Sequence, residues 1–121
     1  MVLEFHQKYG SEFYQTPTLP STETLLLRSR LIAEEAAEFI SAASQKDMEG
    51  MTDAICDLLY VVYGSAVALG VDIEPCFAEV QRSNMSKDGG GRDGGGKVRK
   101  GADYFPPDIK SELVKQGWLP K

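Results

Sequence analysis

The stretch RSRLIAEEAAEFISAAS, residues 28–44, constrains the fold most strongly, because its apolar residues recur at the spacing of an α-helix. At 100° per residue, three acids (Glu34, Glu35 and Glu38) share one face of this helix. The opposite face, which we expect to lie in the core, carries Leu25, Ile32, Ala36, Phe39, Ile40 and Ala43. No Lys or Arg lies between Leu31 and Gln45, so we expect positive charge from outside the helix to offset the repulsion among the acids.

Helical patterns account for most of the remaining chain. We predict helices over residues 2–9, about 22–44, about 51–69, about 73–85 and 109–116, with a turn at 45–50. In the fourth of these, we expect Ile73, Phe77 and Val80 to face inward. No alternating apolar run or β-hairpin signal occurs, so the predicted fold class is all-α: a bundle of about four core helices, a Gly-rich basic loop and a short C-terminal helix.

The Gly-rich segment SKDGGGRDGGGKVRKG, residues 86–101, cannot form a helix or a packed strand. Residues 91–97 match GxxxxGK, but Val98 replaces the required Ser or Thr, and no strand precedes the match, so we reject a P-loop. We predict a single domain over residues 1–121, with the helical bundle at 1–86 and a phosphate-binding or mobile loop and tail at 87–121. A solubilising linker is the alternative interpretation of the glycines.

Charge is distributed unevenly along the chain. Residues 1–86 carry thirteen of the 18 acidic residues and only five of the 13 basic ones. An acidic body argues against binding to a nucleic acid duplex. We also expect a cytoplasmic protein with no membrane partner, because no signal peptide is recognisable and the longest apolar run, residues 58–62, is too short to span a bilayer. Cys56 and Cys76 are expected to be buried free thiols.

A second acidic element lies in the helix that follows. Asp53 and Asp57 stand one turn apart at the start of a stripe that is otherwise small and apolar, as expected where one helix packs on another. Carboxylates in such a seam are costly unless they are paired or bind a metal. Oxygen ligands without His or Cys favour Mg²⁺, with Mn²⁺ possible, over zinc. Solvated acids on two helices are the competing interpretation.

Together these segments resemble a known family. EExxE at Glu34 to Glu38, followed by an acid pair running into DLLYVVYG, resembles the MazG-like all-α nucleoside triphosphate pyrophosphohydrolases, which are related to phosphoribosyl-ATP pyrophosphohydrolase and dimeric dUTPases. The likeness extends to EFHQKYG, LRSRLIAEEAAEF, EVQRSNMSK and GKVRKGADYFPPDI. It implies Mg²⁺-dependent hydrolysis of a nucleoside triphosphate to a monophosphate and pyrophosphate. It further implies a homodimer or homotetramer with shared sites.

The resemblance assigns roles to particular residues. It implies that Glu35, Glu38 and Asp57 hold the metal; Ala54 stands where a fourth acid is expected, so that role passes to Asp53. Glu34 or Glu35 would take a proton from the attacking water, and a second metal bound by Glu34 is the alternative. Candidate substrate-binding residues in the basic segment are Arg82, Asn84, Lys87, Lys97, Lys100 and Tyr104.

Several alternatives remain open at the level of sequence. One interpretation places Phe5 and His6 at a base pocket, but we predict a core Phe and a surface His. Phosphoribosyl-ATP is a second candidate substrate. A metal-binding or nucleotide-binding helical module without turnover, and a plain dimerisation bundle, are the competing classes of function.

Overall fold

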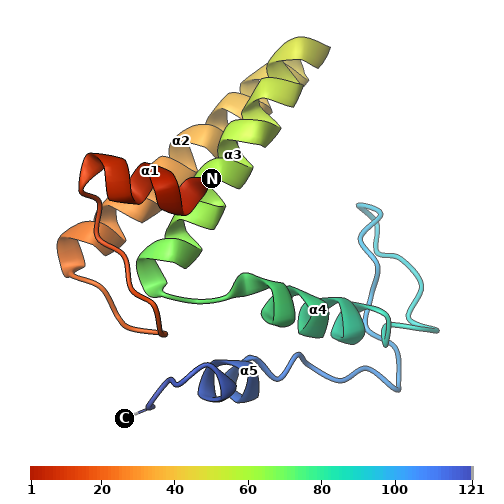
Figure 1. The fold of residues 1–121 in the computed structure, drawn as a ribbon. Helices are drawn as coiled ribbons and strands as arrows, with labels where there is room; N and C mark the ends of the chain where they lie inside the picture. The colour runs from red at the N-terminus through yellow and green to blue at the C-terminus, as the bar shows by residue number, and fades with distance from the viewer. Residues whose placement is uncertain (121) are drawn as a thin grey trace. The chain divides into compact units, whose positions relative to one another are not determined.

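The computed structural model describes residues 1–120 and contains five α-helices (Figure 1). These are α1 (Val2–Tyr9), α2 (Thr22–Ser44), α3 (Met48–Leu69), α4 (Ile73–Asn84) and α5 (Ile109–Lys115). Within residues 1–120 the structure has no strand, and its β pairing is limited to an isolated antiparallel bridge between Arg92 and Val98. The prediction of an all-α fold is confirmed.

Local chemistry explains where the helices begin and end. The Ser21 hydroxyl accepts a hydrogen bond from the Thr24 backbone N–H at 3.2 Å and so caps α2. Asp72 and Asp108 cap α4 and α5 in the same way, as their sequence positions predict. Gly70 ends α3 in the left-handed conformation at φ 69°, and a Cβ atom there would collide with the Thr16 carbonyl oxygen, so no side chain would fit.

The start of α3 differs from the prediction. We expected a turn over residues 45–50, but α3 begins at Met48 and the turn is only three residues long. The Asp47 carboxylate accepts a hydrogen bond from the Gly50 N–H at 3.0 Å, which supplies a cap earlier than expected. Lys46 makes the reversal possible by adopting a positive φ of 54°.

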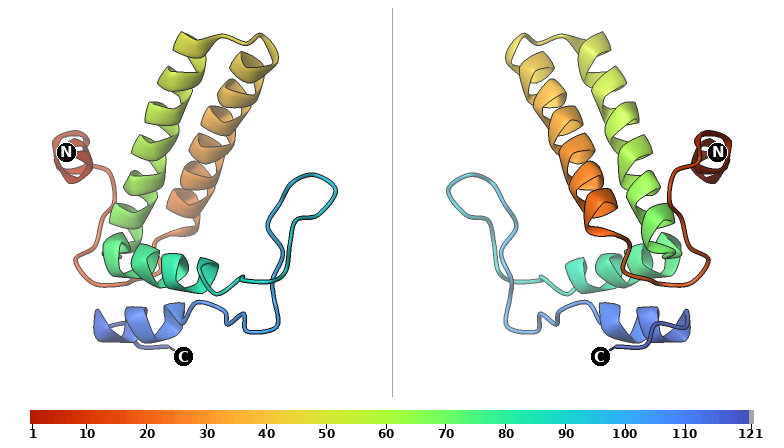
Figure 2. Two further views of the ribbon diagram at one scale, coloured as in Figure 1. Left: turned by 90° about the vertical axis from the view of Figure 1, so that its right-hand side faces the viewer. Right: turned by 90° about the vertical axis from the view of Figure 1, so that its left-hand side faces the viewer.

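The chain divides into two compact units, residues 1–71 and 72–121. In the first unit, α2 and α3 run antiparallel and lie side by side, as both views of Figure 2 show, and α1 packs beside α3. The buried residues of α3 are Ala54, Gly64, Ala66 and Ala68. Because these residues are small, neighbouring segments can pack closely against α3. The second unit contains α4, the Gly-rich loop and α5.

Several burial predictions were wrong. No residue of α2 is fully buried, and Ile40, expected in the core, is 68% exposed. In α4, Phe77 is 71% exposed, whereas Cys76 and Ser83 are the buried residues. Cys56 is an exposed free thiol rather than a buried one. The reason is geometric: a hairpin of two helices covers one narrow seam, so the wide apolar faces read from the sequence extend beyond it.

Helix α3 is apolar enough and long enough to cross a membrane by length and composition alone. This differs from the expectation drawn from the shorter run at residues 58–62. The same test is passed by core helices that pack against other helices, and α3 packs along α2. The finding therefore assigns no membrane role to α3.

Candidate active site

Three carboxylates converge between α2 and α3. Glu35 and Glu38 lie one turn apart on α2, and Asp57 lies on the facing side of α3. One oxygen from each side chain lies within 4.8 Å of the others. Antiparallel pairing of the two helices thus places residues 19 or more positions apart in the sequence at one point of the seam.

The carboxylate of Glu35 is the best-enclosed member of this acid cluster. Its Oε2 atom is buried and has no hydrogen-bond partner in the structure. Burial raises the pKa of Glu35, and the negative charges of Glu38, Asp57 and Glu34 raise it further. An enclosed oxygen without a donor, surrounded by like charge, is an arrangement that a bound cation would stabilise. The donor set, carboxylate oxygens alone, fits a hard divalent ion such as Mg²⁺ or Mn²⁺.

The other two candidate acids lie outside this cluster. Glu34 is exposed, and its Oε1 lies 3.9 Å from Arg30 Nε on the same helix. The expectation that no cation on this helix would offset the acids was therefore wrong: Arg30, four residues before Glu34, was overlooked. Asp53 is exposed on α3, one turn before Asp57. Its role as a fourth ligand stays a prediction.

A pocket of about 340 Å³ adjoins the acid cluster, and Asp57 forms part of its wall. The volume is within the range of small-molecule sites. The pocket lies among α1, α2 and α3, and its other lining residues are Val2, Phe5, His6, Arg28, Leu31, Tyr60, Val61 and Gly64. The walls are thus mostly apolar, with a few polar groups.

Both sequence-based predictions for α1 were wrong. His6, expected on the surface, is only 2% exposed, and Phe5, expected in the core, is 46% exposed. The helix docks on α3 through His6, and the partly exposed Phe5 ring lines the pocket with its centre 5.8 Å from that of the Tyr60 ring, in an edge-on arrangement. The hydrophobic pattern of eight residues did not reveal which side of α1 would face α3.

Sequence reasoning also missed Arg28, a polar residue of the pocket. Its guanidinium donates to the Ser65 hydroxyl at 3.3 Å and to the Val61 carbonyl at 3.2 Å, and lies 3.5 Å from His6 Nε2. Burial lowers the pKa of Arg28. The available signal was its spacing, because Arg28 lies seven residues before Glu35 and therefore on the same face of α2.

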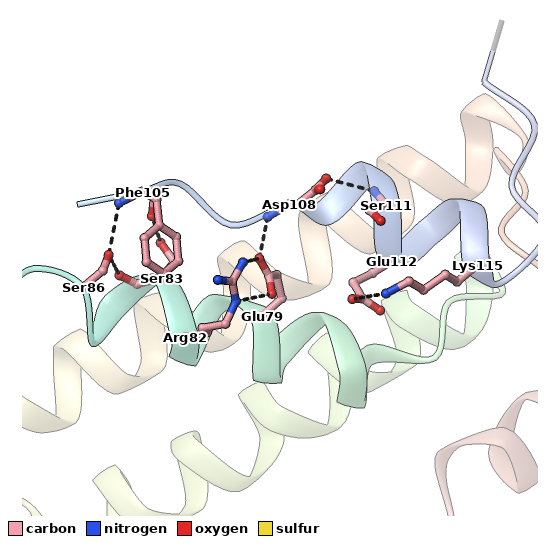
Figure 3. A network of polar contacts seen from close by, with 9 residues as sticks. All are labelled: Glu79, Arg82, Ser83, Ser86, Phe105, Asp108, Ser111, Glu112 and Lys115. Carbon is pink, nitrogen blue, oxygen red and sulfur yellow. Dashed lines mark hydrogen bonds and ion pairs between the residues drawn. The ribbon is translucent and has the colours of Figure 1, made fainter. Parts of the chain in front are cut away.

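The candidate substrate-binding residues of the basic segment all belong to the second unit. Arg82 forms a two-pronged ion pair with Glu79, at 2.9 and 2.6 Å, and lies over the Phe105 ring (Figure 3). Lys100 Nζ lies 4.8 Å from the centre of the Tyr104 ring. Asn84 and Lys97 are exposed, and Lys87 is half-buried.

Hydrogen bonds tie the segment after the Gly-rich loop to α4. The buried Ser83 hydroxyl donates to the Phe105 carbonyl at 2.8 Å, and the Phe105 N–H donates to the Ser86 hydroxyl at 3.1 Å (Figure 3). The Asp108 N–H donates to Glu79 at 2.9 Å. This network fixes both ends of the basic loop on one helix.

Within the loop, the Asp93 carboxylate accepts hydrogen bonds from the N–H groups of Gly95 and Lys97, at 2.9 and 3.0 Å. This contact closes a tight turn at the loop tip.

Comparison with known proteins agrees with this geometry. An uncharacterized protein of Acanthamoeba polyphaga mimivirus is 36% identical over 52 residues, which cover 43% of this chain and 21% of that protein. The chain therefore spans about a fifth of the length of this relative. The model of the phosphoribosyl-ATP pyrophosphohydrolase family matches residues 2–84, more than half of the chain, including all three clustered carboxylates. The chain belongs to this family, within the MazG-like all-α pyrophosphohydrolases.

Proposed function

We propose that this protein hydrolyses a nucleoside triphosphate to a nucleoside monophosphate and pyrophosphate in the presence of Mg²⁺. The observation that carries the proposal is the cluster of Glu35, Glu38 and Asp57, in which Asp57 also lines a pocket of about 340 Å³. An acid cluster alone would be compatible with many functions. Its position beside a mostly apolar pocket provides one place for phosphates and another for a nucleoside.

The residues present fit a divalent metal. Glu35, Glu38 and Asp57 would hold it, with Asp53 as the proposed fourth ligand, and the unpartnered Oε2 of Glu35 supports this assignment. When bound, Mg²⁺ supplies charge neutralisation for the phosphate oxygens and lowers the pKa of a coordinated water. Mn²⁺ has the same ligand preferences and is expected to substitute.

The reaction we propose is attack of water on the α-phosphorus. The water oxygen forms a bond to this phosphorus, and the bond from the phosphorus to the oxygen bridging it to the β-phosphate breaks. The electron pair of that bond leaves with pyrophosphate. Glu34 or Glu35 takes the proton of the water. Glu34 suits this role because it adjoins the cluster without belonging to it.

Basic and polar side chains of the second unit are the proposed partners of the substrate phosphates. Lys87, Lys97 and Lys100 would act as point donors, with Asn84 and Tyr104 adding hydrogen bonds. Arg82 is also proposed as a phosphate ligand. It forms an ion pair with Glu79, so it would have to release the Glu79 carboxylate in order to bind a phosphate.

We propose that a second copy of the chain packs against the exposed apolar side chains of α2 and α3. Large apolar side chains on α2 and α3 remain exposed, among them Leu26, Ile40, Ile55, Leu59, Val62 and Tyr63. Two such hairpins would together provide the four long helices of a bundle, and their association would bury these side chains. We therefore expect a homodimer, or a homotetramer built from dimers. Sedimentation of a fully active monomer would contradict this expectation.

The proposed activity is tested by measuring pyrophosphate release from a panel of ribonucleoside and deoxyribonucleoside triphosphates with Mg²⁺. Phosphoribosyl-ATP belongs in the panel as the second candidate, because the matching family model carries its name. Turnover supports the enzyme. Thermal stabilisation by nucleotide without turnover would instead indicate a binding module, and neither effect would indicate a dimerisation bundle.

Glu38→Gln tests the metal site with little change in shape. We expect it to reduce turnover at least a hundredfold while leaving helix content unchanged, because it removes one anionic ligand. Glu49→Gln is the matched control, since Glu49 is an exposed acid in the first turn of α3 and lies outside the cluster. Equal activity of the two variants would remove the metal-site assignment.

A further inference from the structure

The Arg28 guanidinium is half-buried in the first unit and forms no ion pair with a carboxylate of the described residues. Within residues 1–120, none of its hydrogen bonds or ion pairs involves an acid. Enclosing a cation in this way costs free energy unless a ligand or another group compensates. The side chain nevertheless has a defined position, because three acceptors from α1 and α3 surround it.

The hydrogen atoms of these acceptors can be assigned from their other partners. His6 Nδ1 lies 3.1 Å from the Val2 carbonyl oxygen and so carries a proton, which leaves the lone pair of Nε2 directed at Arg28. The Ser65 hydroxyl donates to the Val61 carbonyl at 2.9 Å and so accepts from Arg28. These contacts use three of the five guanidinium N–H groups, and two remain for a ligand.

The backbone makes room for this arrangement at Gly64. A Cβ atom there would lie 2.5 Å from Arg28 Nη2 and 3.2 Å from His6 Cε1. The absence of a side chain at this helical position therefore allows the guanidinium to lie against α3. Arg28, His6 and Gly64 all line the pocket that Asp57 also lines.

The spacing along α3 relates this cation to the acid cluster. Asp57 and Gly64 are seven residues apart on one helix, a rise of about 10 Å; both line the pocket, and the Arg28 guanidinium lies against Gly64. Between them the walls are apolar, and the exposed rings of Phe5 and Tyr60 provide surfaces on which a base would stack. With phosphates at the acid cluster, the base would lie toward Arg28.

We propose that Arg28 determines specificity by donating hydrogen bonds to the acceptor edge of an oxo-bearing nucleobase. This inference rests on the proposed function for the orientation of the substrate. Guanine, hypoxanthine, uracil and thymine present a carbonyl oxygen at the position where adenine and cytosine present an amino group. A guanidinium has donors only, so it pairs with the carbonyl and opposes the amino group.

The test compares substrates that differ at this one group. For the wild-type protein we expect kcat/KM for ITP to exceed that for ATP about tenfold or more, and kcat/KM for UTP to exceed that for CTP by a similar factor. The reason is that ITP and UTP accept a hydrogen bond from a charged donor and ATP and CTP do not. Arg28→Met should bring both ratios close to one. Arg28→Lys, which keeps the charge but not the fork of donors, should give intermediate ratios.

A purely structural role for Arg28 predicts a different result. In that case Arg28→Met would lower kcat/KM for ITP and ATP by the same factor and leave their ratio unchanged, and this outcome would overturn the proposal. Melting curves and circular dichroism of Arg28→Lys and Arg28→Met identify any variant that fails to fold.

A binding measurement separates this inference from the proposed activity. Calorimetric titration of the full chain with inosine and adenosine, which have no phosphates, should show preference for inosine in the wild type and in Glu38→Gln, but not in Arg28→Met. If no triphosphate is hydrolysed and this preference is present, the proposed activity fails and the Arg28 assignment stands. If triphosphates are hydrolysed but inosine and adenosine bind equally well, the proposed activity stands and the Arg28 assignment fails.

Discussion

Gly64→Ala provides a direct test of how closely α1, α2 and α3 pack around the pocket. On propensity alone, replacing a helix-interior Gly by Ala stabilises a protein by about 1 kcal/mol. Here the new methyl group would lie 2.5 Å from Arg28 Nη2, although ordinary contacts begin at 3.4 Å, so the guanidinium would have to retreat by about 1 Å. Its 3.2 Å hydrogen bond to the Val61 carbonyl and its 3.5 Å contact with His6 would then lengthen and weaken.

The size of the effect follows from these competing contributions. A hydrogen bond from a charged donor contributes about 1.5–3 kcal/mol, and the substitution weakens the two that Arg28 makes with Val61 and His6. The gain in helix propensity offsets about 1 kcal/mol of this loss. We therefore expect Gly64→Ala to lower the free energy of unfolding by about 1–3 kcal/mol. Urea denaturation followed by circular dichroism at 222 nm measures the difference.

A double-mutant cycle with Arg28→Ala identifies the clash as the cause. In the Arg28→Ala background the methyl group no longer meets the guanidinium, so Gly64→Ala should be neutral or stabilising there. Thr52→Ala, at an exposed position of α3, is the control for helix propensity. If Gly64→Ala stabilises the wild-type protein by about 1 kcal/mol, or if the two substitutions are additive, the packing described here is incorrect.

Three further predictions concern single side chains. The fold raises the pKa of Glu35 above its ordinary value of about 4.5, so the ionised carboxylate destabilises the metal-free protein as pH rises above that value. Glu35→Gln should therefore raise Tm at pH 7 in EDTA, and Mg²⁺ should no longer stabilise the variant. Hydrogen bonds from Thr24, Tyr14 and Ser21 lower the pKa of Glu12 to about 2, so Glu12→Gln should lower Tm at pH 7, with the difference from wild type shrinking as pH falls from about 4.5 to 2. Ser83→Ala leaves the Phe105 carbonyl without its donor and should cost about 1–2 kcal/mol in urea denaturation, with equal stability of the variant contradicting the contact.

The amino-acid sequence determined the helices and the acids that they carry. Helix ends at Ser21, Gly70 and Asp72 follow from capping chemistry, which depends on a few neighbouring residues. The convergence of Glu35 with Asp57 was likewise predictable, because the acids of each helix share one face and a short turn makes the two helices antiparallel.

Only the tertiary structure decided which faces are covered. His6 and Phe5 exchange their expected places because the docking of α1 depends on the shape of α3, where Gly64 leaves room for a ring and a guanidinium. Arg28 became a pocket residue for the same reason. Hydrophobic periodicity shows which side chains of a helix are apolar. Whether such a side chain is buried depends on which segment packs against that face of the helix, and that segment is distant in the sequence.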